Sequence, residues 1–151
     1  LTACRHAGVT SAKAVGRARG IGTVDVYVST PEGVPGQALL TELQTVFQKS
    51  REIAVDVQVK APEAVEVNMT LTVKPAEGTA FEAAKAAVES ELAGFFGGRL
   101  LGQSVKLAEL YSRIYALDAV ENCRITLPAA DTEISATELP VLGTVSITEE
   151  A

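Results

Sequence analysis

Alternation of apolar and polar residues is the strongest pattern along the chain. In residues 53–59 and 65–73 every second position carries Ile, Val, Met or Leu, and the positions between them are mainly polar. Residues 23–28 repeat the pattern with Val24, Val26 and Val28. A period of two is typical of strands that bury one face and leave the other in water. We therefore predict three strands in these stretches.

The connection between the second and third of these strands is short. Residues 61–64 separate them, and Pro62 lacks the N–H that a central strand needs, so it marks a turn or a sheet edge. Because short connections usually join neighbouring elements, we expect the two strands to form a hairpin-like antiparallel pair. Weaker strand signals follow at residues 120–127 and, after Pro140, at residues 141–148.

Three other stretches change to the period of a helix, with apolar residues at i, i+3, i+4 and i+7. We predict helices over residues 37–50, 80–95 and 105–117. Thr79 and Glu82 have the spacing of a capping box at the start of the second helix, and Gly97-Gly98 marks its end. Ser104 is the expected N-cap of the third.

From residue 23 to 127 the order is strand, helix, strand, strand, helix, short helix, strand. This order predicts an α+β fold of the split βαβ, ferredoxin-like kind, in which helices cover one face of a single antiparallel sheet. We divide the chain into an N-terminal extended segment (1–19), a ferredoxin-like core (20–127) and a C-terminal strand segment (128–151). Both end segments are expected to add strands, by pairing with one another or with the sheet edge.

The first segment is expected to be the tail of a preceding domain, because the chain begins at Leu1 rather than Met. The sheet face away from the helices is expected to present polar side chains to water or to a partner, and it is too polar for an obligate apolar interface. Its expected members are Asp25, Tyr27, Asp56, Gln58, Glu66, Asn68, Thr70 and Thr72.

Composition and charge narrow the classes of partner. With 151 residues, of which 47% are hydrophobic and 21% charged, the chain can build one globular core. A net charge of −6 disfavours nucleic acid, whose affinity comes mainly from Lys and Arg. No apolar run reaches the roughly 18 residues of a membrane span, so we expect a soluble protein made in a reducing cytoplasm. One basic cluster lies near the N-terminus, without interleaved aromatic residues, and is expected to be solvated or to face a partner. It comprises Arg5, Lys13, Arg17 and Arg19.

Residues that support catalysis or metal binding are few and scattered. His6 is the single histidine and has no serine motif to serve, so we expect a surface residue. Glu89 and Glu91 stand two apart on a helix and point in different directions. Cys4 and Cys123 suit neither a disulfide scaffold nor a zinc site, and we expect both to be reduced and partly buried. We assign no catalytic, cofactor-binding or metal-binding residues and no cofactor, and an acidic surface calcium site stays open.

Several short stretches, taken in order, carry a family resemblance. They are His6–Thr10, Gly20–Val28 with its G-x-G-T-V strand, Arg51–Ala54, Val57–Pro62 and Glu138–Gly143. Their order and spacing over about 140 residues resemble the C-terminal region of the baseplate J-like family, the wedge proteins of contractile phage tails and related injection systems. Ala119-Val120 departs from the Gly-Val expected there, which affects the turn before the last core strand.

The resemblance implies a non-enzymatic structural role, with packing into a wedge or ring that joins the tail tube and sheath to the host-recognition apparatus. The implied partners are other baseplate and tail proteins and further copies of the chain, with neither nucleic acid nor membrane. The implied location is the virion tail baseplate, after assembly in the cytoplasm of the bacterial host. The family carries no catalytic residue to transfer.

Two other functions stay open. Split βαβ sheets also form small-ligand regulatory domains, and fold alone does not separate these from scaffolds. A ferredoxin-like enzyme that uses a carboxylate would need a convergent pocket. For the assembly role, we expect contacts at the arm from Arg5 to Arg19, at the edge near residues 61–64 and at the C-terminal strand.

Overall fold

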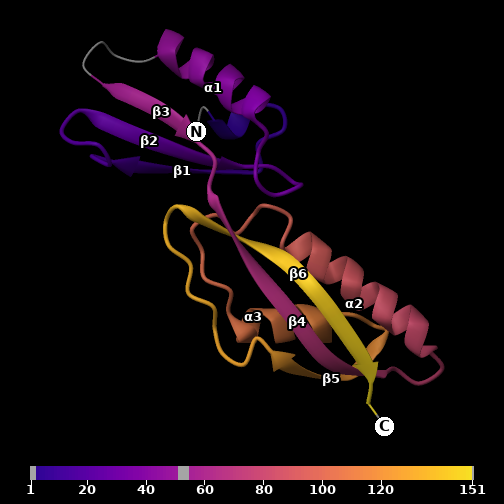
Figure 1. The fold of residues 1–151 in the computed structure, drawn as a ribbon. Helices are drawn as coiled ribbons and strands as arrows, with labels where there is room; N and C mark the ends of the chain where they lie inside the picture. Colours follow the sequence, from indigo (N-terminus) through magenta and orange to yellow (C-terminus); the bar gives the residue numbers. More distant parts are fainter. Residues whose placement is uncertain (1–2, 51–54, 151) are drawn as a thin grey trace.

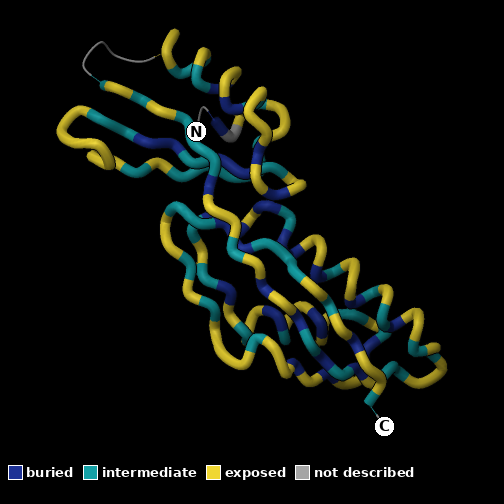
Figure 2. The backbone as a smooth tube through the Cα atoms, viewed as in Figure 1, coloured by how far each residue is buried: buried dark blue, intermediate teal, exposed yellow. Residues whose placement is uncertain are grey.

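The computed structural model describes residues 3–50 and 55–150, which form two three-stranded sheets placed one beyond the other (Figure 1). The strand order is β1-β2-β3 in the first sheet and β5-β4-β6 in the second. Each sheet has helices packed against it. The buried positions accordingly fall into two clusters, one in each sheet unit (Figure 2).

The first sheet is built around a parallel crossover. It contains β1 (Ser11–Gly16), β2 (Thr23–Ser29) and β3 (Asp56–Lys60), preceded by the short 3-10 helix η1 (Ala3–Arg5). β1 is antiparallel to β2, and β2 is parallel to β3 through α1 (Gln37–Ser50). The valine face of β2 packs against the leucine stripe of α1, with Val26, Val28, Leu40 and Leu43 buried. A helix in the connection is the usual way to join two parallel neighbours.

The second sheet has β4 (Glu63–Pro75) at its centre. β4 is antiparallel to β5 (Val120–Leu127) and parallel to β6 (Glu138–Glu149). The helices α2 (Phe81–Phe95) and α3 (Leu107–Tyr115) cover the apolar face. Met69, Leu71, Val88 and Ile114 are fully buried there. Each such side chain stabilises the fold by about 1.5–3 kcal/mol relative to exposure.

The predicted α+β class is confirmed, but the single split βαβ sheet is wrong. β3 and β4 do not form the expected hairpin, because β3 pairs only with β2 and β4 pairs with β5 and β6. Ala61 and Pro62 instead carry the chain from one sheet to the other. Alternation shows that a strand has one buried face, but it does not identify the neighbouring strand, and here two small cores take the place of one.

The end segments add strands as expected. β1 pairs with β2, and β6 pairs with β4, so each extends the edge of a sheet. β6 begins at Glu138 and includes Pro140, three residues earlier than the sequence pattern predicts. Ile53 and the rest of residues 51–54 lie outside the described part of the chain. The division at residues 19 and 127 into separate units stays a prediction.

Two predicted helix caps are wrong. α2 begins at Phe81 without a side-chain cap, so Thr79 and Glu82 do not form a capping box. The N–H of Leu107, at the start of α3, donates to Asp131 Oδ1 at 2.8 Å. Ser104 Oγ instead donates to Glu133 Oε2 at 2.9 Å. A loop distant in sequence supplies these partners, and local spacing does not reveal them.

Candidate functional site

The residues with catalytic potential serve local structure. Within residues 3–50 and 55–150, no group of three or more His, Cys, Asp or Glu side chains could hold a metal ion. His6 is half-buried, with Nε2 3.2 Å from Glu42 Oε1. Cys123 is a buried free thiol whose pKa is raised mainly by burial, and a raised pKa makes a poor nucleophile. In the described part of the chain, no helix is long and apolar enough to cross a membrane.

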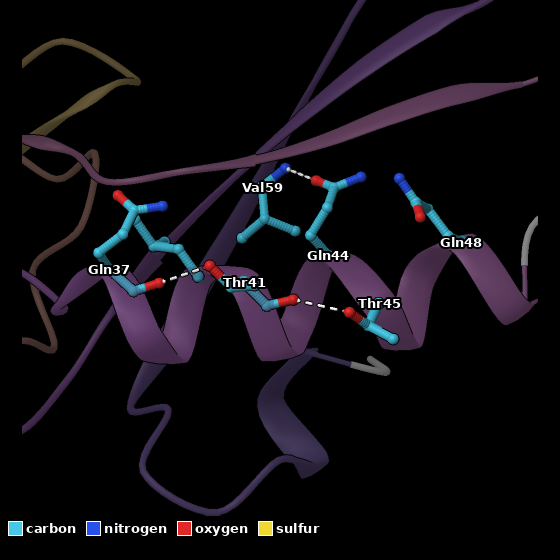
Figure 3. Close-up of a pocket in the computed structure, with 7 residues that line it drawn as sticks. Gln37, Thr41, Gln44, Thr45, Gln48 and Val59 are labelled. Carbon is cyan, nitrogen blue, oxygen red and sulfur yellow. Dashed lines mark hydrogen bonds between the residues drawn. The ribbon is translucent and has the colours of Figure 1, made fainter.

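Two shallow grooves lie on the first sheet unit. One, of about 310 Å³, lies between α1 and β3 (Figure 3), and the other, of about 390 Å³, lies beside the loop that follows β2. The first is lined by neutral amide, hydroxyl and aliphatic groups, and Glu32 is the charged residue of the second. Neither groove presents the converging charges that an anionic or cationic metabolite would need.

The first groove contains a side chain that closes a sheet edge. Gln44, on α1, donates from Nε2 to the carbonyl of Val57 at 2.7 Å and accepts the N–H of Val59 at Oε1, also at 2.7 Å. Both backbone groups lie on the edge of β3 that faces away from β2. The primary amide therefore acts as a substitute for a neighbouring strand, because it offers the donor and the acceptor of a peptide group (Figure 3).

The edge of β5 is closed in a similar way by α3. The hydroxyl of Tyr111 accepts the N–H of Ile125 at 3.0 Å. The hydroxyl of Tyr115 lies 3.4 Å from the backbone nitrogen of Cys123, 3.2 Å from its carbonyl oxygen and 2.6 Å from Asn122 Oδ1. The two tyrosine rings stack with centroids 6.2 Å apart. An unpaired edge invites aggregation, so these hydroxyls protect the strand.

The other two edges, of β1 and β6, differ from these. Within the described residues, no side chain hydrogen-bonds the outward backbone groups of either strand. Asn68 Oδ1 does accept the N–H of Thr144 at 2.9 Å, but it fills the irregularity between β4 and β6, where Gly143 leaves room for it. Of the four sheet edges in the part of the chain that the structure describes, helix side chains therefore close two and leave two open.

The two sheet units meet at a close junction. Ser29, fully buried at the end of β2, donates its hydroxyl to the carbonyl of Gly98 at 2.5 Å. Gly98 has a positive φ of 78°, and a Cβ built on it would lie 1.9 Å from the carbonyl oxygen of Thr30. Lys13 Nζ adds a hydrogen bond to the carbonyl of Gly102 at 3.3 Å. Backbone thus packs on backbone where the two sheet units meet.

Asp25 corrects the prediction of a wholly exposed polar face. It is 1% exposed, and its carboxylate accepts Arg19 Nε at 2.7 Å and Lys60 Nζ at 2.5 Å. Arg19 also pairs with Asp56. Hydrogen bonds from Lys60 and then Arg19 hold the pKa of Asp25 below its ordinary value, against the opposite effect of burial. This network ties the β1–β2 turn to β2 and β3.

The three expected contact regions have different outcomes. The basic arm is divided, because Arg19 and Lys13 are engaged within the chain while Arg5 and Arg17 are exposed. Residues 61–64 form no hairpin edge, because Ala61 and the buried Pro62 cross between the sheets and Glu63 begins β4. The C-terminal strand is a sheet edge. Sequence reasoning missed the roles of Gln44, Tyr111, Tyr115, Ser29 and Gly98.

In these features, polar side chains position the backbone and close two of the sheet edges. The model of the family described as baseplate J-like protein C-terminal domain matches residues 67–148, and the chain belongs to this family. The match covers more than half of the chain and spans β4 to β6, including α2 and α3. No curated protein matches the chain. Membership confirms the resemblance and suggests a structural, non-enzymatic role in a phage baseplate.

Proposed function

We propose that the chain is an assembly domain of the baseplate in a contractile phage tail, or in a related prophage or injection system. It takes part in wedge assembly through contacts with other baseplate and tail proteins and with further copies of itself. It works in the tail after assembly in the host cytoplasm, and its task is to hold neighbouring proteins in a fixed geometry.

The observation that carries this proposal is the close junction between the sheets. The hydroxyl of Ser29 is buried against the carbonyl of Gly98, and the glycine leaves no space for a side chain. A buried hydrogen bond makes a net contribution of about 0.5–1.5 kcal/mol to the stability of the fold. The close packing of backbone on backbone further restricts movement between the sheets. A domain whose two sheets meet in this way is better suited to hold neighbouring proteins in place than to open and close around a substrate.

Charge supports protein partners over nucleic acid. The chain carries 19 Asp and Glu residues against 13 Lys and Arg residues. Of the four arginines and lysines in its basic arm, Arg19 and Lys13 already have partners within the chain. An acidic surface repels a phosphate backbone.

The proposal is tested by labelling tails. The source genome is altered to carry a tag on this protein, tails are purified, and gold particles bound to the tag are located by electron microscopy. We expect the label at the baseplate end of the tail. Complete tails that lack the label, with the tagged protein only in the unassembled fraction, would overturn the proposal.

The small-ligand regulatory domain loses its structural premise, because the described residues form two three-stranded sheets and not the single split βαβ sheet on which that hypothesis rested. Thermal unfolding in the presence of amino acids and nucleotides gives an independent check. We expect an unchanged midpoint, since neither groove gathers charged groups. A ligand that raised the midpoint by several degrees would favour the regulatory function.

A further inference from the structure

We propose that copies of this chain join head to tail, by addition of β1 of one copy to the open edge of β6 of the next. This inference rests on the proposed assembly function and names the surface that performs it. Its basis is the unequal treatment of the four sheet edges. Side chains of α1 and α3 close β3 and β5, whereas β1 and β6 keep their outward backbone groups free of side-chain hydrogen bonds in the described part of the chain.

The open part of β6 is its C-terminal half. Glu150 donates its N–H to the carbonyl of Val73, which fixes the phase of the parallel ladder between β4 and β6. By alternation, the N–H and C=O groups of Val145, Ile147 and Glu149 point away from β4. The first half of β6 is less suitable, because Pro140 has no N–H and the carbonyl of Glu138 already accepts Gly102 N–H.

The open part of β1 has the same length. Arg17 donates its N–H to the carbonyl of Thr23, which fixes the phase of the antiparallel ladder between β1 and β2. The backbone groups of Ala12, Ala14 and Gly16 therefore point away from β2. These residues have the smallest side chains, and Ala14 and Gly16 are exposed, so a second strand can approach closely. Three outward residues on β1 match three on β6.

Charge selects both the pair and its direction. β6 ends at Glu149 and is followed by Glu150, whereas β1 ends at Gly16 and is followed by Arg17. Arg17 and Glu149 are exposed and make no ion pair among the described residues. In a parallel arrangement with Gly16 opposite Thr148, the outward groups of Gly16 meet those of Ile147 and Glu149, and Arg17 lies directly opposite Glu149. Parallel pairing of β6 with a second β6 would instead place like charges together, which is unfavourable.

The two edges belong to different sheets at different ends of the same chain (Figure 1). A contact between two different surfaces is heterologous, and such contacts repeat until they close a ring or extend as a filament. The fixed junction at Gly98 would then set the angle between successive copies.

Sedimentation of the chain over a wide range of concentrations tests the proposal. The variants are Arg17→Glu, Glu149→Arg and the two together, with the fold of each confirmed by circular dichroism. We expect the chain to self-associate, each single variant to weaken association about fivefold or more, and the double variant to recover most of it. Amide exchange at Ala14 and Ile147 should slow as concentration rises.

Charge changes away from both edges serve as controls. Lys106→Glu and Glu89→Arg alter exposed residues near and on the helices of the second sheet by the same charge, and they should leave association unchanged. A chain that stays monomeric, a double variant as weak as the single ones, or controls that weaken association equally would each overturn the pairing. If the chain is monomeric but still labels the baseplate, only this inference fails. If it associates through these edges but never enters tails, the proposed function fails.

Discussion

Replacement of Gly98 by alanine is the perturbation that most directly probes the junction between the sheets. The new methyl group would lie 1.9 Å from the carbonyl oxygen of Thr30, although real Cβ atoms essentially never approach closer than 3.0 Å. Thr30 cannot easily yield, because its carbonyl accepts Gly33 N–H at 3.0 Å and its N–H donates back to Gly33 at 2.8 Å. We therefore expect the overlap to be relieved by a shift of the segment around Gly98 away from Thr30, which separates the two sheet units at this point.

Three costs determine the size of the effect. A non-glycine residue in the left-handed region costs about 1–2 kcal/mol. Separation at Gly98 breaks the hydrogen bond from Ser29, and a buried hydroxyl left without a partner costs about 1–3 kcal/mol. Loss of close packing at the junction adds to both. We expect Gly98→Ala to lower the free energy of unfolding by about 3 kcal/mol or more, which is a large share of a typical total of about 5–15 kcal/mol.

Urea unfolding, followed by circular dichroism, measures this loss, and two glycines provide controls. Gly78 has nearly the same φ, 80°, but nothing lies within 4 Å of its built Cβ, so Gly78→Ala isolates the backbone cost at about 1–2 kcal/mol. Gly94 lies inside α2, also with open space, and Gly94→Ala should stabilise by about 0.5–1 kcal/mol. Equal losses for Gly98→Ala and Gly78→Ala would refute the reasoning about the junction.

Three further predictions concern the buried carboxylate and the closed edges. The lowered pKa of Asp25 stabilises the fold above the unfolded pKa of about 4 and ceases to do so as pH falls through the lowered value. Asp25→Asn should therefore lower the free energy of unfolding by about 2 kcal/mol at neutral pH. In urea unfolding, the difference from wild type should shrink below about pH 4, and a difference independent of pH would contradict this. Gln44→Leu should lower the free energy of unfolding by about 1 kcal/mol and increase aggregation, detected by thioflavin binding. Gln48→Leu, in the same groove, should change neither quantity. Identical behaviour of the two variants would argue against closure of the β3 edge by Gln44. Tyr115→Phe should lower the free energy of unfolding by about 1 kcal/mol and speed amide exchange at Cys123. Tyr27→Phe is the matched control. Unchanged exchange at Cys123 in Tyr115→Phe would exclude the Tyr115 hydroxyl as the partner of that amide.

The individual elements could be predicted from the sequence because each depends on local periodicity. β2, α1 and β5 lie where the pattern of apolar residues places them, and β4 and α2 differ only at their ends. The pairing of strands could not be predicted in the same way. A strand such as β3 needs only one apolar face to be covered. A helix covers that face equally well whether β3 belongs to a small sheet under α1 or lies beside β4 in a larger sheet.

The site residues were missed because their roles depend on partners distant in sequence. Gln44 looks like an ordinary polar residue on the exposed face of a helix until β3 lies beside it. The sequence places Tyr111 in the apolar stripe of α3. Its hydroxyl is identified as a partner of the β5 edge only once β5 lies beside the helix. Gly98 was predicted as a helix end, and its positive φ agrees with that, but its packing against Thr30 requires the other sheet.

The central claim is that this chain is a rigid part of the baseplate whose contacts use its open sheet edges. A cryo-electron microscopy map of the assembled tail tests it most directly. We expect density for the chain in the baseplate, with the two sheets in the relative orientation set by Gly98 and with the edges of β3 and β5 free of partner strands. A baseplate without the chain, or one in which partner strands are added to β3 or β5, would contradict it.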